Sequence, residues 1–249
     1  MAPALFALLL FQAGQPSTAV KDFDEWRSKQ PAQTNIFVLH AQYRDHLSQR
    51  GLTDAQIKAI YIDLERDRWD RAYSDPNPFF NPAPNAFMAE IVKTLKPGRA
   101  LDIGMGQGRN AVHLAKLGWE VTGFDISETG MAIARKSAEA AGVKLTALNA
   151  TIDDFDYGDR QWDLIVATYE GAAWRERAAR GLKPGGIVIV EGFLKGPQTP
   201  PVVSFEPNEL PKMFLELNLR ILRYEDVDGK PDWGIRPGRV VRLCAQRAE

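Results

Sequence analysis

The sequence is poor in the residues that form disulfides and bind soft metals. Its 249 residues include one cysteine, Cys244, and three histidines. A single cysteine excludes an internal disulfide. The histidines do not stand at a metal-ligand spacing: His40, His46 and His113. We expect no metal site, and a chain of this length can bury enough apolar surface to fold without one.

The sequence also lacks a strong charge of either sign. The formal net charge is −1, and Lys and Arg form no block. Nucleic-acid binding depends on clustered positive charge that neutralises phosphates. We therefore expect no nucleic-acid partner.

No apolar run is long enough to cross a bilayer. The uncharged apolar segment near the N-terminus, Ala4 to Phe11, is an octet, far shorter than a membrane span. Small residues follow at Ser17 to Ala19, which is typical of a secretory signal, although no Lys or Arg precedes the octet. We interpret residues 1–19 as a signal-like or membrane-associated segment. A helix packed on the domain is the alternative.

The most informative stretch is residues 99–127, where apolar runs flank a glycine turn. The pattern predicts a strand, a turn, a helix and a second strand: Ala100–Ile103, Gly104–Gly108, Arg109–Leu117 and Glu120–Phe124. Glycine lets a ligand approach the backbone because no Cβ stands in the way. The first N–H groups of the helix point at the same place. The stretch therefore predicts a nucleotide-type site at the carboxyl ends of parallel strands.

Two carboxylates frame this turn. Asp102 precedes the first glycine by two residues, and Asp125 ends the second strand, where an acid can accept both hydroxyls of a ribose. Asp102 would repel a pyrophosphate, and it suits a ligand with a cationic amine. Gly104, Gly106 and Gly108 stand two apart, whereas the dinucleotide fingerprint ends with a spacing of three. These features disfavour a dinucleotide.

The pattern D-x-G-x-G-x-G, with an acid at the end of the next strand, resembles the class I S-adenosylmethionine (SAM) dependent methyltransferases. The longer run GRNAVHLAKLGWEVTGFDIS is most similar to the tellurite-resistance and thiopurine-type branch, and LKPGG at 182–186 before an apolar strand is a second feature of the family. The resemblance implies SAM as cofactor and an α/β, Rossmann-like fold. Its seven-stranded sheet would be mostly parallel with an antiparallel last strand, and helices would cover both faces.

The resemblance also implies which residues bind the cofactor. Asp102 would attract its amino group, and Asp125 would accept the ribose hydroxyls or, alternatively, serve as a charge at a helix start. Arg109 would reach the cofactor carboxylate or lie on the surface. An acid after the third strand commonly holds the adenine amine, and Asp153 is the best candidate here. The implied set is Asp102, Gly104, Gly106, Gly108, Arg109, Asn110, Asp125, Ile126, Ile152 and Asp153.

The acceptor side follows the fourth predicted strand, Trp162–Thr168. In the family this strand end faces the methyl group. The chain has no N-P-P-Y motif, which disfavours amide or base nitrogens as acceptors. The catalytic candidates are Tyr169, as a wall or polarising group, and Glu170, as a base, although an acid at a helix start also has a structural reason. A soft nucleophile such as a thiolate would react without a base.

The segment ahead of the glycine turn predicts a helical cap. Residues 20–33 look irregular, a helix is expected over 35–49, and a capping box at Thr53–Gln56 opens another. Residues 74–84 form a proline-rich loop. Four aromatic side chains either line a lid over the cofactor or attach the cap to the core: Trp69, Tyr73, Phe79 and Phe80.

The rest of the chain continues the strand–helix alternation. Helices are expected over 85–95, 127–141, 171–180 and 207–217, strands over 144–148, 187–191, 219–224 and 239–245, and loops over 182–186 and 192–204. The predicted organisation is a signal-like segment at 1–19, a helical cap and lid loop at 20–84, and a SAM-binding domain at 85–249.

The leading functional hypothesis is a SAM-dependent methyltransferase that acts on a small-molecule acceptor by in-line displacement. Two alternatives remain: an NAD-linked oxidoreductase on a similar sheet, and a SAM-binding protein without catalysis. The cofactor favours a cytoplasmic location, whereas residues 1–19 favour export or membrane association.

Overall fold

The computed structural model describes residues 17–76, 80–196, 203–229 and 238–248. The chain forms two compact units, Met1–Asp67 and Arg68–Glu249. Most of the signal-like segment lies outside the described residues. Within the described ranges, no helix combines the length and apolar character needed to cross a bilayer. The predicted boundaries after residues 19 and 84 stay predictions.

Among its described residues, the first unit contains the start of three helices: α1 (Thr18–Ser28), α2 (Ile36–Gln49) and α3 (Asp54–Ser74). The expected irregular structure over 20–33 is wrong, because Ser17 caps α1 and the buried side chains of Val20 and Phe23 stand one helical turn apart. The predicted capping box is confirmed. The backbone N–H of Thr53 donates to Gln56 Oε1 at 2.9 Å, and that of Gln56 donates to Thr53 Oγ1 at 3.3 Å.

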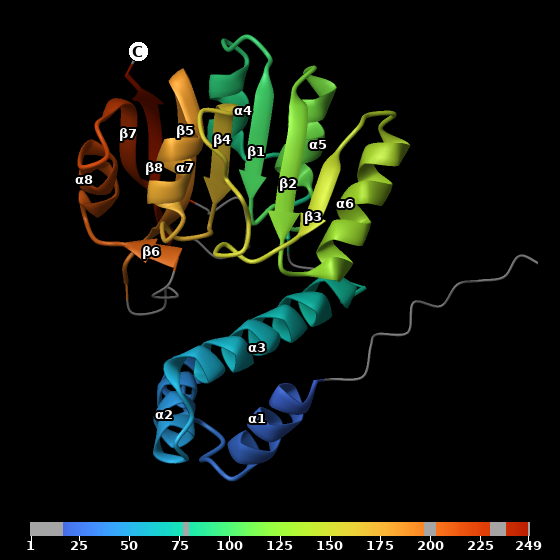
Figure 1. Cartoon of the computed structure of the whole chain (residues 1–249), viewed down its shortest axis with the longest axis vertical. Helices are drawn as coiled ribbons and strands as arrows, with labels where there is room; N and C mark the ends of the chain where they lie inside the picture. Colours follow the sequence, from blue (N-terminus) through green and yellow to red (C-terminus); the bar gives the residue numbers. More distant parts are fainter. Residues whose placement is uncertain (1–16, 77–79, 197–202, 230–237, 249) are drawn as a thin grey trace, which may run out of the picture. The chain divides into compact units, whose positions relative to one another are not determined.

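The second unit is built on an eight-stranded sheet (Figure 1). Its strands are β1 (Arg99–Ile103), β2 (Glu120–Asp125), β3 (Thr146–Asn149), β4 (Trp162–Thr168), β5 (Leu182–Leu194), β6 (Ser204–Phe205), β7 (Leu219–Gly229) and β8 (Gly238–Arg247). Seven follow the order β3-β2-β1-β4-β5-β8-β7, and the short β6 pairs with β5. β8 runs antiparallel to both of its neighbours, whereas the pairs formed by β1 to β5 are parallel. The predicted fold class is confirmed.

Helices cover both faces of this sheet (Figure 1). They are α4 (Ala86–Val92), α5 (Arg109–Lys116), α6 (Glu128–Ala140), α7 (Arg175–Gly181) and α8 (Glu209–Leu215). Successive strand residues serve opposite cores, as the two-residue period of a strand requires. Leu164 packs in the cluster that contains Met88 of α4 and Leu114 of α5, whereas Ile165 packs with Trp174 and Phe214. Burial on both faces explains the continuous apolar runs of the strands.

Two loop predictions need correction near β5. The tight turn expected over 182–186 is part of the strand, because Trp162 pairs with Leu182 and Leu164 pairs with Ile187 across a register shift. The strand also continues to Leu194, inside the loop expected over 192–204. Residues 197–202 of that loop lie outside the described residues. The helix expected over 171–180 begins at Arg175.

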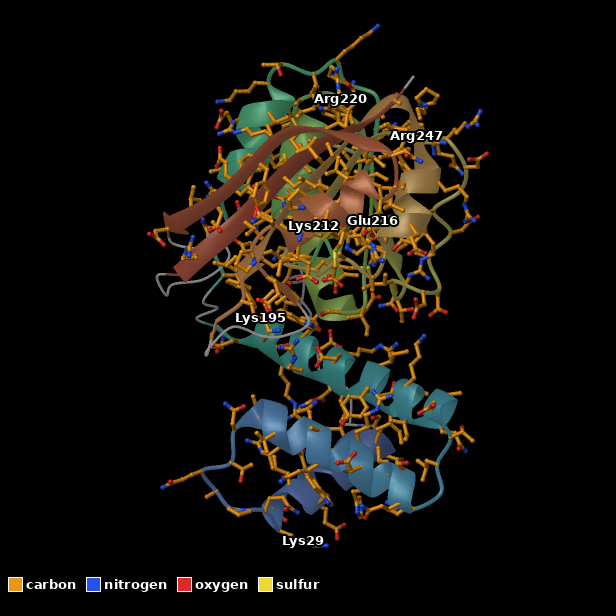
Figure 2. All side chains as sticks on the ribbon, turned by 90° about the vertical axis from the view of Figure 1, so that its left-hand side faces the viewer. Lys29, Lys195, Lys212, Glu216, Arg220 and Arg247 are labelled. Carbon is orange, nitrogen blue, oxygen red and sulfur yellow. The ribbon has the colours of Figure 1, made fainter. Side chains whose placement is uncertain are left out.

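The β7 side of the sheet carries exposed charges. Lys212 and Glu216, at the end of α8, and Arg220 on β7 are labelled in Figure 2 on the side that faces the viewer. Arg220 donates to Gln246 Oε1 at 2.6 Å. Among the described strands, β7 pairs with β8 alone, and charged side chains on such an edge discourage pairing with another chain.

Candidate functional site

The glycine turn joins β1 to α5 at the carboxyl edge of the sheet. Gly104, Gly106 and Gly108 have φ values of +62°, +52° and +77°, a region that residues with a Cβ rarely adopt. A Cβ on Gly108 would lie 2.6 Å from the Cβ of Ala134 on α6. The third glycine therefore allows two helices to pack closely.

The first two glycines are covered by polar side chains of the same unit. A Cβ on Gly104 would lie 2.5 Å from Glu170 Oε2, and a Cβ on Gly106 would lie 2.1 Å from Tyr73 Oη. Without a Cβ, Gly104 and Gly106 allow these two side chains to lie against the backbone of the turn. Tyr73 is largely buried, and burial raises the pKa of its hydroxyl, with the nearby Asp125 and Glu170 carboxylates acting in the same direction.

Asp102 lies at the end of β1 and is 1% exposed. Burial raises the pKa of its carboxyl to about 7, while Arg109 and the backbone N–H of Ala111 oppose the rise. Within the described part of the chain, Oδ2 of Asp102 has no hydrogen-bond partner. A buried acceptor without a partner is costly. It suits a ligand that brings an N–H group or a positive charge.

Asp125 ties two turns together at the end of β2. Its Oδ2 accepts the backbone N–H of Gly106 at 2.9 Å, and its Oδ1 accepts that of Ser127 at 2.8 Å. Burial raises the pKa of this carboxyl, and the two backbone N–H groups oppose the rise. Each oxygen keeps a second lone pair, so the carboxylate can still accept hydroxyls of a ligand.

A cavity of about 40 Å³ lies beside the glycine turn. Asn110 in its wall accepts the backbone N–H of Asn85 at 2.8 Å and donates to Thr168 Oγ1 at 3.2 Å. Arg109 donates to the carbonyl of Ala83 at 3.0 Å. The lining residues are Tyr73, Phe80, Gly104, Met105, Gln107, Arg109, Asn110 and Thr168.

Three of the four aromatic candidates pack together. The ring centroids of Tyr73 and Phe80 are 5.0 Å apart, and Trp69 lies 5.8 Å from Tyr73 and 6.0 Å from Phe80. Tyr73 and Phe80 both line the cavity. Phe79 lies outside the described residues. The predicted lid role of this group stays a prediction.

The end of β4 turns sharply at Tyr169, whose φ is +62°. A bulky residue in this conformation is strained, and its surroundings must hold it. The backbone N–H of Tyr169 donates to the carbonyl of Glu191 at 2.7 Å, and its hydroxyl donates to the Glu191 carboxylate. The side chain of Glu191 is 0% exposed and pairs with Arg242 Nε at 2.7 Å. Glu170 follows the turn, with its carboxylate over Gly104.

Comparison with known proteins finds similarity to methyltransferases over part of the chain. The model of the family described as "Methyltransferase domain" matches residues 100–186. A ubiquinone biosynthesis O-methyltransferase of Alkalilimnicola ehrlichii is 27% identical over 161 residues, 61% of this chain and 64% of the relative. A probable SAM-dependent methyltransferase, TehB, of Haemophilus influenzae is 30% identical over 81 residues, 32% of this chain and 28% of the relative. The chain therefore spans less than two thirds of the length of either relative.

The similarity over residues 100–186 supports a class I SAM-dependent methyltransferase domain in this part of the chain. Solved structures agree on the fold. TehB of H. influenzae superposes with a TM-score of 0.57 at 19% identity over 73% of this chain and 66% of that one. Magnesium protoporphyrin IX methyltransferase of Synechocystis, with bound SAH, gives 0.55 at 17% identity over 79% of this chain and 100% of that one.

The residues of the site fit SAM. Asp102 offers a buried oxygen without a partner in the described part of the chain, which suits the ammonium group of the cofactor. Gly104 and Gly106 carry no Cβ where Glu170 and Tyr73 now lie. Each carboxylate oxygen of Asp125 accepts one backbone N–H and keeps a lone pair for a ligand hydroxyl. Among the described residues, no group of three or more His, Cys, Asp or Glu side chains could hold a metal ion.

The other predicted cofactor-binding residues, among them the adenine candidate Asp153, are spread over two loops. The carbonyl of Ile126 accepts Asn149 Nδ2 at 3.1 Å, and Ile152 packs against the α7–α8 core. Asp153 is exposed and pairs with Arg177 of α7 at 2.8 Å. The cofactor-binding roles of Ile126, Ile152 and Asp153 stay predictions.

Several site residues were not predicted from the sequence. Asp70 lies on α3, and it accepts the hydroxyl of Ser127 at 2.6 Å. The sequence could have indicated Glu191 as a site residue, because it is an acid at the end of an otherwise apolar run. Nothing in the sequence distinguishes Arg242, because an arginine on a strand with one exposed face is common.

Proposed function

We propose that this methyltransferase transfers the methyl group of SAM to a small-molecule acceptor. The observation that carries the proposal is the pair of buried carboxylates, Asp102 and Asp125, on either side of a glycine turn with positive φ angles. Two acids at one turn favour a cationic nucleoside over a diphosphate. The names of the relatives, which include ubiquinone biosynthesis O-methyltransferases, support a small acceptor.

In this proposal each part of the chain has one task. Asp102 holds the amino group of the cofactor, and Asp125 accepts the ribose hydroxyls. When bound, SAM supplies a methyl group on a sulfonium, whose leaving group is a neutral thioether. The protein must align the acceptor with that methyl group and exclude water.

Tyr169 and Glu170 are the proposed acceptor-side residues. The hydroxyl of Tyr169 is committed to the Glu191 carboxylate, so Tyr169 forms a wall of the site. Glu170 is the candidate general base, because its carboxylate lies beside the first glycine. A base serves an acceptor that still carries its proton, such as a hydroxyl group.

Cofactor binding requires side chains to move. The cavity of about 40 Å³ is smaller than the roughly 300–1,000 Å³ of typical ligand pockets. Tyr73 and Glu170 lie over Gly106 and Gly104, where the nucleoside must approach. Both side chains therefore shift when SAM binds.

Two measurements test this function. Titration calorimetry of the full chain with SAM and with its demethylated product, SAH, should show saturable binding of both. Methyl-labelled SAM, incubated with the enzyme and a cell metabolite extract, should then label a small molecule. Absence of SAM and SAH binding at millimolar concentration would refute the proposal, and label that stays on SAM would favour a binding protein without catalysis.

A further inference from the structure

The end of α3 contacts both turns of the candidate cofactor site. Asp70 and Tyr73 stand three residues apart on one face of this helix, and both belong to the second unit. Tyr73 Oη lies over Gly106, and a Cβ on Gly130 would meet Tyr73 Cε2 at 2.9 Å. Asp70 lies against the first turn of α6.

The Asp70 carboxylate begins a continuous series of hydrogen bonds. Its Oδ1 accepts the hydroxyl of Ser127 at 2.6 Å and the backbone N–H of Thr129 at 3.0 Å. The Ser127 hydroxyl in turn accepts the backbone N–H of Gly130 at 3.0 Å, and the Ser127 N–H donates to Asp125. The series ends where Asp125 accepts the N–H of Gly106 at 2.9 Å.

Asp70 controls the orientation of a buried hydroxyl. Ser127 is 0% exposed, and its O–H donates to the Asp70 carboxylate. With Asp70 present, the proton points to the carboxylate, and the oxygen lone pairs face the first turn of α6. Without Asp70, two donors at the start of α6 lose their acceptor: Ser127 O–H and Thr129 N–H. Buried donors that lose a charged acceptor are costly, so the turn that carries Asp125 and Ile126 should rearrange.

We propose that Asp70 is a positioning residue for the nucleoside half of SAM, acting through Ser127 and Asp125. The inference rests on the proposed function, because it assigns the β2–α6 turn to the nucleoside. Asp70 itself need not touch the ligand. Its effect should therefore appear with any ligand that carries adenosine, whether or not the methionine part is present.

The test compares Asp70→Ala and Asp70→Asn with a matched control. Asp163 is a suitable control, because it also accepts one backbone N–H, from Arg99 at 2.8 Å, and one side-chain donor, Lys183 Nζ at 2.7 Å. It lies near the amino end of β4, whereas the glycine turn lies at the carboxyl end of the parallel neighbour β1. Asp163→Ala should lower the melting temperature and leave ligand affinity unchanged.

We expect Asp70→Ala to weaken binding of SAH and of adenosine by the same factor, about 10- to 100-fold for the loss of a charged hydrogen-bond acceptor. Asp70→Asn keeps an oxygen acceptor and should recover most of the affinity. Asp102→Asn should weaken SAH and spare adenosine, because its partner is on the methionine part. Amide hydrogen exchange without ligand should be faster at residues 127–130 in Asp70→Ala than in the parent.

The outcomes separate the two proposals. Parent protein that binds neither SAM nor SAH would remove the proposed function, and this inference with it. If the parent binds SAH, three results would each overturn the role of Asp70 alone: unchanged affinity in Asp70→Ala, an equal loss in Asp163→Ala, or a loss for SAH without a loss for adenosine. If Asp70→Ala does not fold, Asp70→Leu, which also lacks an acceptor but fills the space, decides by the same comparison with Asp163→Leu.

Discussion

The two sides of the candidate site are held by different interactions. At the ends of β1 and β2, two backbone N–H groups hold the Asp125 carboxylate, and both come from within 19 residues of it. At the ends of β4 and β5, the Tyr169 turn is held by side chains. Glu191 of β5 pairs with Arg242 of β8, and Arg242 reaches Glu225 of β7 at 3.5 Å.

This difference determines whether a substitution on each side changes stability or ligand binding first. Register places Glu191 directly opposite Arg242, and Arg242 opposite Glu225. The charges therefore form a row across three strands beside the acceptor side. A substitution in the row should affect stability first, whereas a substitution in the glycine turn should affect ligand binding first.

The largest expected effect comes from breaking the charge row. Arg242→Ala removes the arginine that pairs with the fully buried Glu191 carboxylate, and loss of one partner of a buried ion pair costs about 3–5 kcal/mol of unfolding free energy. Chemical denaturation measures this loss. SAH affinity of the folded variant should match that of the parent.

The control for this variant is a more exposed pair between β8 and β7. Arg239 pairs with Asp226 at 2.7 Å, and its side chain is 53% exposed, against 23% for Arg242. Arg239→Ala should cost about 0–1 kcal/mol, as is usual for exposed pairs. Equal losses in the two variants would show that burial of Glu191 does not decide the stability of this side.

The second effect is expected in the glycine turn. Gly106→Val places a branched side chain at φ +52° and against Tyr73 Oη, so SAH affinity should fall about 100-fold or more because the ligand and the valine compete for one space. Calorimetry measures the affinity.

Gly142→Val is the control that separates backbone strain at a positive φ from filling of the space over Gly106. Gly142 has φ +66°, and among the described atoms none lies within 4 Å of its Cβ position. The variant should lose stability through the same backbone strain and keep its affinity for SAH. A large loss of affinity in Gly142→Val would mean that general strain, and not the space over Gly106, explains the Gly106 result.

The third effect concerns pH. The carboxyl of Asp102 has a pKa raised to about 7 by burial, and an ammonium group binds its ionised form. SAH affinity should therefore rise with pH, by about tenfold between pH 6 and pH 8, and level off above that range. Asp102→Asn should show a flat profile, whereas Asp163→Asn should keep the slope of the parent.

The raised pKa of Asp102 has the opposite effect on stability, which we expect to fall as pH rises. The folded pKa lies above the unfolded value of 3.8, so the folded state holds the proton more tightly. The contribution of Asp102 to the free energy of unfolding is fully present below the unfolded pKa and is lost as pH rises through about 7. Asp102→Asn should therefore be more stable than the parent at pH 8, although it binds SAH less well. A variant that is less stable at pH 8 would contradict this.

The contrast between the two sides also explains what the sequence could predict. Asp102, the three glycines and Asp125 lie within one strand–turn–helix–strand unit, so their spacing carries the geometry. Asp70 reaches Ser127 from 57 residues away, and Arg242 reaches Glu191 from 51 residues away. No local pattern encodes such contacts, because they depend on strand register and helix docking.

Errors in the fold follow the same physics. α1 was missed because its short apolar repeat, Val20 and Phe23, is sparse among polar residues. The turn over 182–186 was placed outside β5 because a register shift beside Trp162 leaves no trace in the sequence. The parallel core strands were predicted well, because burial on both faces makes them uniformly apolar.

The smallest effect tests the packing of Tyr73 against α6. A Cβ on Gly130 would lie 2.9 Å from Tyr73 Cε2, so Gly130→Ala should cost about 1 kcal/mol of stability through overpacking. In a Tyr73→Ala background the same change should stabilise by about 1 kcal/mol, because alanine is the better helix residue. Denaturation of the four proteins of this cycle measures the reversal. If Gly130→Ala changes the free energy of unfolding in the same direction in both backgrounds, Tyr73 does not pack on α6. The contact between the end of α3 and α6 would then depend on Asp70 alone.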